Sequence, residues 1–212
     1  MNHLELLISR YPVLASCKAQ IEEACAMLID TYEKDGKVLA CGNGGSASDA
    51  AHIVGELMKS FTRHRDIRDV RSKLYDTLPE EDASFISENL EGALAAVSLL
   101  GETALVSAYA NDVSPEMIYA QQVLGLGRKG DSLIGVTTSG NSKNVVRAVQ
   151  TAKALGIRTI GLTGESGGLL KDLCDVCICV PEKETYQVQE LHLPVYHAIC
   201  LIVEEHFFPE PR

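Results

Sequence analysis

The sequence predicts an α/β fold in which helices cover both faces of a parallel sheet. Two observations lead to this class. Short apolar runs alternate along the chain with longer stretches of helical periodicity, an order typical of parallel strands joined by crossover helices. A unit of strand, polar loop and helix also recurs three times, with its loops at residues 42–46, 137–142 and 163–168. The 212 residues are enough for one domain with a substantial core, so we expect a single domain over 1–212.

The chain begins with a helical segment, which we assign to residues 1–35. Apolar side chains follow helical spacing there, but Pro12 interrupts the pattern, which predicts two helices or one kinked helix. A short apolar run at 37–41 predicts the first strand. After the Gly-rich loop 42–46, a helix is expected over about 47–60.

The segment 62–92 has the weakest pattern in the chain. Basic and acidic residues alternate over 62–73, the run 79–82 is acidic, and aromatic residues are sparse. This composition favours a solvated, irregular insertion or lid over a nucleic-acid surface.

The rest of the chain alternates regularly between the two kinds of element. We expect strands at 93–100, 131–136, 158–162 and 176–180, and helices at 103–110, 115–126, 143–155 and 187–207. A short helix should lie between the third polar loop and the last strand.

The composition excludes several classes of function. Hydrophobic residues make up 46 % of the chain and the formal net charge is −10, so a basic surface for nucleic acid is not expected. No apolar run approaches the roughly 20 residues of a membrane span. Glu5 and Arg10 lie within the first helical stretch and are not typical of a signal peptide. We therefore expect a cytoplasmic protein that binds neither nucleic acid nor membrane.

The seven cysteines could serve chemistry or packing. Cys174 and Cys177 form a CxxC motif, which occurs in metal and redox sites. However, Cys177 and Cys179 lie in an apolar run that resembles a buried strand, and no second CxxC motif is present to complete a zinc site. The pattern favours structural thiols, and the odd count argues against a disulfide framework.

The three polar loops predict a phosphate site. In open α/β sheets, ligands bind beyond the carboxyl ends of the strands, where these loops should converge. The loop 137–142 contains several hydroxyl side chains and opens a helix, and hydroxyls with helix N-terminal N–H groups hold phosphate without Lys or Arg. The same residues could instead serve only turns and caps. The Gly-rich loop matches neither the dinucleotide fingerprint nor the P-loop, so no nucleotide cofactor is expected.

Two helices bring together groups suited to proton transfer. His52 and Glu56 are four residues apart and share a helix face. Gln189, His192 and His197 lie on the last helix, where residues eight apart share a face. Together they offer a base, an acid and possible metal ligands for proton transfer next to a carbonyl group. A hydrogen-bonded polar cluster without metal is the alternative interpretation.

Taken together, these motifs resemble the sugar isomerase (SIS) domain family, and within it the phosphoheptose isomerase branch. The resemblance is carried by residues 42–52 with Glu56, by Asn111-Asp112, by 138–142, by 162–164, and by 189–192 with His197. It runs from about residue 5 to 206 and fails mainly across 62–95. It implies a flavodoxin-like three-layer sandwich with a five-stranded parallel sheet, and a homotetramer whose sites lie at subunit interfaces.

The resemblance also implies roles for individual residues. Glu56 would be the base and His197 the acid of an isomerisation through an enediol, most simply between sedoheptulose 7-phosphate and D-glycero-D-manno-heptose 7-phosphate. His52, Glu56, Gln189 and His197 match positions that bind zinc in some members, so Zn²⁺ is a possible cofactor. The substrate would be bound by Asn43, Gly44, Gly45, Ser46, Glu56, Asn111, Asp112, Thr137, Thr138, Ser139, Ser142 and Gln189.

Two departures from the family pattern leave the sugar open. Ser60 stands where the family usually has Arg, and Tyr186 stands where an Asp is common. Another ketose phosphate on the same scaffold is therefore an alternative substrate. A different class of function is a non-catalytic module that senses sugar phosphate or binds a protein such as a replication initiator.

Overall fold

The apolar runs form one parallel sheet, as the sequence predicts. A computed structural model describes residues 2–67 and 69–209, and within them five strands pair in the order β2-β1-β3-β4-β5. All four pairings are parallel, and this order is that of the flavodoxin-like fold. The strands are β1 (Val38–Cys41), β2 (Ala96–Ser98), β3 (Ser132–Val136), β4 (Arg158–Thr163) and β5 (Val176–Cys179).

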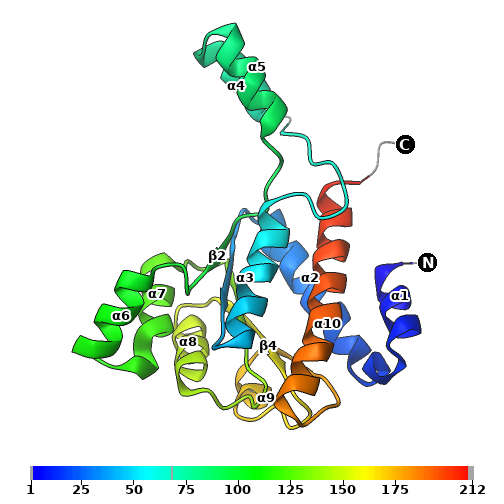
Figure 1. The fold of residues 1–212 in the computed structure, drawn as a ribbon, viewed down its shortest axis with the longest axis vertical. Helices are drawn as coiled ribbons and strands as arrows, with labels where there is room; N and C mark the ends of the chain where they lie inside the picture. The colour runs from blue at the N-terminus through cyan, green and yellow to red at the C-terminus, as the bar shows by residue number, and fades with distance from the viewer. Residues whose placement is uncertain (1, 68, 210–212) are drawn as a thin grey trace.

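Helices connect the strands and flank the sheet (Figure 1). The N-terminal segment comprises α1 (His3–Arg10), the 3₁₀ helix η1 (Pro12–Cys17) and α2 (Lys18–Glu33), so Pro12 begins a separate turn. The other helices are α3 (Gly45–Met58), α4 (Asp69–Thr77), α5 (Glu80–Asn89), α6 (Thr103–Asp112), η2 (Pro115–Met117), α7 (Ile118–Leu126), α8 (Lys143–Ala154), α9 (Leu170–Leu173) and α10 (Thr185–Phe207).

The sheet separates two apolar cores, which gives the predicted three layers. Successive strand residues point to opposite faces; in β1, Val38 and Ala40 face one core and Leu39 and Cys41 the other. The first core is closed by α1, α2, α3 and α10. The second is closed mainly by α7 and α8, with Leu170 of α9. The predicted fold class is thus confirmed.

The segment 62–92 differs from the expected irregular insertion. It contains α4 and α5, which pack against each other as a helical hairpin that extends away from the sheet in Figure 1. The sequence did not reveal these helices because a helical period is read from apolar residues on a buried face, and this segment is mostly charged. Even its large apolar side chains Tyr75 and Phe85 are 46 % and 68 % exposed. The strand expected at 93–100 is also shorter, covering only Ala96–Ser98.

A buried ion pair anchors the base of this hairpin. Arg65 and Glu204 each have 1 % of their side chain exposed, and the Arg65 Nε donates to Glu204 Oε1 at 2.8 Å. The Arg65 guanidinium also donates to the carbonyl oxygens of Glu56 and Leu57, at the end of α3. Glu204 accepts the backbone N–H groups of Phe61 and Thr62. The pair therefore fixes the chain after α3 against α10.

None of the described helices combines the length and the apolar character needed to cross a bilayer.

Candidate functional site

The Gly-rich loop joins β1 to α3 at the carboxyl edge of the sheet. Gly44 has φ +56° and ψ −124°, a backbone conformation that residues other than glycine rarely adopt. A Cβ on Gly45 would lie 2.4 Å from Nε2 of Gln189, so the end of that side chain would have to move. Gln189 on α10 therefore lies directly against the start of α3. Ser46, the next residue, is buried in the first turn of this helix.

Hydrogen bonds connect this loop to the first turn of α8 and to α7. The side-chain amides of Asn43 and Asn144 exchange two hydrogen bonds of 2.8 Å. The Tyr119 hydroxyl donates to the Gly42 carbonyl oxygen. Asn144 and Tyr119 did not stand out in the sequence, because their contacts cross from one connection of the sheet to another.

The loop 137–142 presents its hydroxyls before α8, as the phosphate interpretation requires. The Thr137 and Ser142 hydroxyls are 2.8 Å apart, and the Ser139 Oγ accepts the N–H of Asn141 at 3.2 Å. Ser142 occupies the N-cap position, but its hydroxyl does not cap the helix. Thr138 precedes the exposed Ser139 and is half-buried. Hydroxyls and the first turn of a helix are thus grouped, a combination that suits an anion.

The second group of predicted residues lies farther along α3. Glu56 is 8 % exposed, and each of its carboxylate oxygens has one partner. Oε1 is 3.1 Å from His52 Nε2, and Oε2 accepts from the Lys59 ammonium at 3.1 Å. The other nitrogen of His52, Nδ1, is 2.9 Å from the Tyr196 hydroxyl. Lys59 and Tyr196 were missed in the sequence, since Tyr196 reaches His52 only through the packing of α10 on α3.

His197 completes this second group. Its ring centre is 5.0 Å from that of His52, and its buried Nε2 has no hydrogen-bond partner among the described residues. Burial lowers the pKa of His197, and the neighbouring His52 lowers it further. Its imidazole is therefore mainly neutral at pH 7, and its Nε2 is a buried polar atom without a partner among the described residues.

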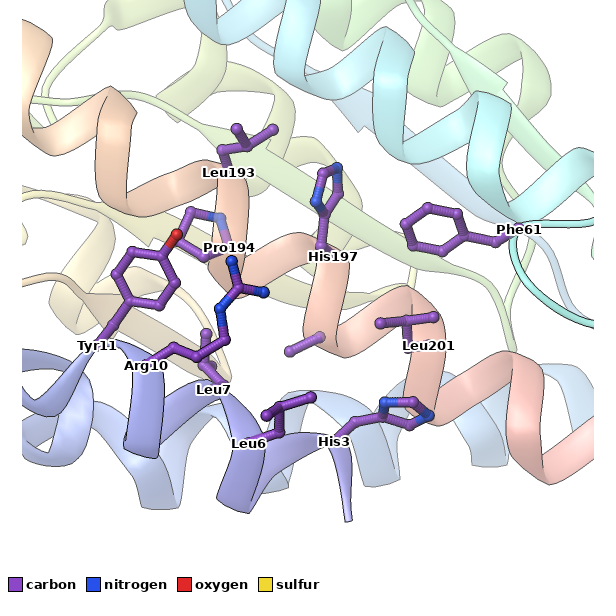
Figure 2. A pocket seen from close by; sticks show the side chains of 11 residues that line it. His3, Leu6, Leu7, Arg10, Tyr11, Phe61, Leu193, Pro194, His197 and Leu201 are labelled. Atoms are coloured by element: carbon purple, nitrogen blue, oxygen red, sulfur yellow. The ribbon is translucent and has the colours of Figure 1, made fainter. Parts of the chain in front are cut away.

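His197 borders a cavity between α1 and α10 (Figure 2). The cavity measures about 260 Å³. Figure 2 shows His197 and Phe61 along one side and His3, Leu6 and Arg10 of α1 along the other. The cavity gives His197 an opening on the face of the molecule where α1 lies.

The two groups are separated within one chain. Glu56 follows Gly45 by eleven residues on the same helix, α3, which corresponds to about 16 Å along the axis. The Gly-rich loop and the loop 137–142 form the first group, which we call the loop group. Gln189 belongs to it because its amide lies against Gly45. On α10, Gln189 is eight residues before His197. Asn111 and Asp112 lie at the exposed end of α6, where the Asn111 amide donates a hydrogen bond of 2.8 Å to the Asp112 carboxylate. No hydrogen bond of the described residues joins these two to the Gly-rich loop.

The four predicted zinc ligands do not converge in this chain. His52, Glu56 and His197 are neighbours, but the amide of Gln189 lies against Gly45. Within residues 2–67 and 69–209, no group of three or more His, Cys, Asp and Glu side chains is arranged to hold a metal ion. His192 is fully buried, and burial lowers its pKa to about 4, against an opposing effect from the backbone of Thr163. It is therefore a neutral core residue.

The chain matches known proteins in family models, in sequence and in structure. SIS domain family models match residues 92–202 and 9–77. The chain is similar to a phosphoheptose isomerase of Helicobacter pylori, with 39 % identity over 92 % of this chain and 88 % of the relative. It is similar in structure to the phosphoheptose isomerase GmhA of Neisseria gonorrhoeae, with 31 % identity, a TM-score of 0.69, and 95 % and 98 % of the two chains covered. A phosphoheptose isomerase of Francisella tularensis aligns with a TM-score of 0.73 and 29 % identity, over 97 % of this chain and all of the other.

Proposed function

The chain belongs to the SIS domain family, in its phosphoheptose isomerase branch, and on this premise we propose that it is an aldose–ketose isomerase for a phosphorylated sugar. The substrate pair that we propose is sedoheptulose 7-phosphate and D-glycero-D-manno-heptose 7-phosphate. The observation that carries the proposal is the buried Glu56 carboxylate beside His197, whose Nε2 has no partner. An isomerase assay on a panel of ketose phosphates tests it. Binding without turnover of any member would favour a sensing module instead.

In the proposed reaction Glu56 carries the proton between the two carbons. Its carboxylate removes the proton from the carbon next to the carbonyl group and returns it to the neighbouring carbon, so that an enediol forms between the two steps. His52 and Lys59 hold one carboxylate oxygen each, which orients the base. His197 moves the second proton: it protonates the carbonyl oxygen as the enediol forms and takes the proton of the neighbouring hydroxyl group as the new carbonyl group forms. Tyr196 would orient His52 from the other side.

The loop 137–142 is proposed to bind the phosphate group. We expect the double substitution Ser139→Ala and Ser142→Ala to weaken sugar-phosphate binding by about 1.5–3 kcal/mol for each hydrogen bond lost to the charged group. Calorimetry measures the change. Ser107→Ala on the exposed face of α6 removes a similar hydroxyl and should leave the affinity unchanged. Equal affinity in the double variant and the wild type would exclude this loop from the phosphate site.

We further propose that a neighbouring subunit completes each site. The separation of the loop group from Glu56 along α3 supports this arrangement, because both groups serve one substrate in the proposed reaction. A homotetramer with sites at its interfaces would bring the loop group of one chain to Glu56 of another. Light scattering after gel filtration measures the oligomeric state.

Complementation between variants tests the shared site more directly. Glu56→Gln keeps the phosphate loop, whereas the double serine variant keeps Glu56. Co-expressed chains, assayed below the KM of the wild type, should recover roughly a quarter of wild-type activity. A site is intact only when its loop comes from the Glu56 variant and its Glu56 from the serine variant, and chains assemble at random. Folded variants mixed without subunit exchange serve as the control. Mixed oligomers that recover nothing would place both groups of one chain in the same site.

Zinc binding stays a proposal from the family pattern. Imidazole and carboxylate are suitable ligands for zinc, whereas the Gln189 amide is a poorer one and points elsewhere in this chain. Elemental analysis of protein purified without chelator or metal-affinity tag decides it, together with His52→Ala as the variant that should lose the metal.

A further inference from the structure

A group of thiols lies beside the edge strand β5, among residues to which no role has been assigned above. All seven cysteines are free. Four of them, Cys17, Cys174, Cys177 and Cys179, line a cavity of about 350 Å³ together with Lys171. Cys174, Cys177 and Cys179 are only partly buried. The sequence pattern favoured buried structural thiols, but the structure leaves these three accessible from the cavity.

Cys177 and Cys179 form a close pair within this group. They alternate with the buried residues of β5, so that both side chains lie on the same side of the strand. Their sulfur atoms are 3.8 Å apart. The Thr163 hydroxyl on β4 lies 3.4 Å from the Cys179 sulfur and 3.7 Å from that of Cys177.

The surroundings distinguish the two sulfurs. The hydrogen bond between the two sulfurs lowers the pKa of Cys179 to about 6, against the effect of burial. The Thr163 hydroxyl and the positive charge of Lys171 lower it further. The same bond and burial raise the pKa of Cys177. Cys174 lines the same cavity, yet burial raises its pKa to about 12. Among the three thiols that reach the cavity from β5 and the segment just before it, Cys179 is therefore the one whose thiolate form is favoured.

We propose that Cys179 is a peroxide-reactive thiolate and that Cys177 is its resolving partner. The Cys179 thiolate attacks one oxygen of hydrogen peroxide, which forms the sulfenic acid and releases hydroxide. The Cys177 sulfur then attacks the sulfenic sulfur, so that a disulfide forms and water leaves with the Cys177 proton. Both thiols are oxidised and one peroxide is reduced to water, so no other reactant is required.

The disulfide requires the strand to bend locally between Cys177 and Cys179. Residues two apart on a strand have Cα atoms about 6.6 Å apart, within the roughly 4.4–6.8 Å that disulfides span, but their Cβ atoms must come within about 3.5–4.5 Å, closer than an extended strand holds them. The sulfurs must approach by a little under 2 Å from their present 3.8 Å. Because β5 pairs only with β4 among the described strands, one of its edges is free to twist.

Oxidation at this place would reach the proposed phosphate loop. A Cβ on Gly167 would lie 2.9 Å from the Cys179 sulfur, and one on Gly140 would overlap the Gly167 carbonyl. Leu170 N–H donates to Gly140 O at 3.2 Å, and Leu169 N–H donates to the Asn141 side chain at 3.0 Å. The segment 167–170 therefore transmits a displacement of Cys179 to the loop 137–142. This consequence rests on the proposed function, whereas the thiol chemistry does not.

Peptide mass spectrometry tests the thiol assignment on the full-length protein. Trypsin should release residues 172–183 as one peptide that contains Cys174, Cys177 and Cys179. After hydrogen peroxide, we expect wild-type peptide that has lost two hydrogens through a Cys177–Cys179 disulfide. In Cys177→Ser, the sulfenic acid should persist at Cys179 and be trapped by dimedone. In Cys179→Ser, neither product should form. Circular dichroism of each variant verifies folding.

A second measurement separates reactivity from access. At pH 7, iodoacetamide should alkylate Cys179 at least ten-fold faster than Cys174, which lines the same cavity. Equal rates, or dimedone on Cys174 in place of Cys179, would overturn the proposal. For the proposed link to the loop, peroxide should raise the KM of the wild type and leave that of Cys179→Ser unchanged. An unchanged KM in fully oxidised wild type would disprove the link while the thiol assignment stands.

Discussion

Glu56→Gln should lower kcat by about 10²–10⁴ while substrate binding is largely kept. The amide preserves the size and most hydrogen bonds of the side chain, but it cannot accept the substrate proton at neutral pH. Exchange of solvent deuterium into the substrate should fall in parallel, because the same proton transfer governs both. The measurement is kcat and KM together with isotope incorporation followed by NMR.

The matched control is Glu22→Gln on the exposed face of α2, which also removes one negative charge. It should leave kcat and KM unchanged. Should Glu56→Gln turn over at the wild-type rate, the proton carrier is another group. The Lys59 ammonium and the His52 ring would then hold a structural carboxylate.

Arg65→Met should destabilise the protein by about 3–5 kcal/mol, since it leaves the buried Glu204 carboxylate without its counter-charge. Burial alone raises the pKa of Glu204, but the N–H groups of Phe61 and Thr62 and the Arg65 guanidinium outweigh it and hold the pKa below its usual value. The carboxylate therefore stabilises the fold above the pKa of the unfolded chain, and this contribution is lost as the pH falls. The difference between variant and wild type should shrink in acid. Urea unfolding at pH 7 and near pH 4 measures both effects.

An exposed ion pair gives the control for Arg65. Arg71 and Asp66 are 3.4 Å apart with 49 % of each side chain exposed, so Arg71→Ala should change stability by at most about 1 kcal/mol. Arg65→Met should also lower kcat in the folded fraction, because Arg65 holds the Glu56 and Leu57 carbonyl oxygens at the end of α3. If the two variants proved equally stable, the buried pair would not anchor this end of the helix.

The position of the hydroxyl-rich loop 137–142 could be predicted from sequence because its signal is local. Hydroxyl residues that follow an apolar strand and open a helix must lie at the carboxyl edge of a parallel sheet, whatever the rest of the chain does. The pairing of His52 with Glu56 was equally local, since four residues make one helical turn. Lys59, Tyr196 and Asn144 gave no such signal, because each acts through a contact that depends on how neighbouring elements end or pack.

The insertion 62–92 is the part of the fold that could not be predicted from the sequence. Its charge masked the helical period of α4 and α5, and only the contact of one helix with the other reveals them as a hairpin. Arg65 lay in the same charged run and resembled a solvated residue. In the structure it is among the most deeply buried side chains, because Glu204 lies 139 residues away in sequence but directly opposite.

The sequence by itself determined the class of fold, the family and the residue types available for proton transfer and phosphate binding. These follow from periodicity and from motifs within single turns, for which neighbours along the chain are neighbours in space. Only the tertiary structure decided how these residues are grouped. It brought Gln189 to the Gly-rich loop, left Glu56 and His197 farther down α3 and α10, and turned two strand cysteines toward one cavity. The physical reason is that a helix or strand fixes the direction of each side chain, whereas the partner that a side chain meets depends on packing between distant segments.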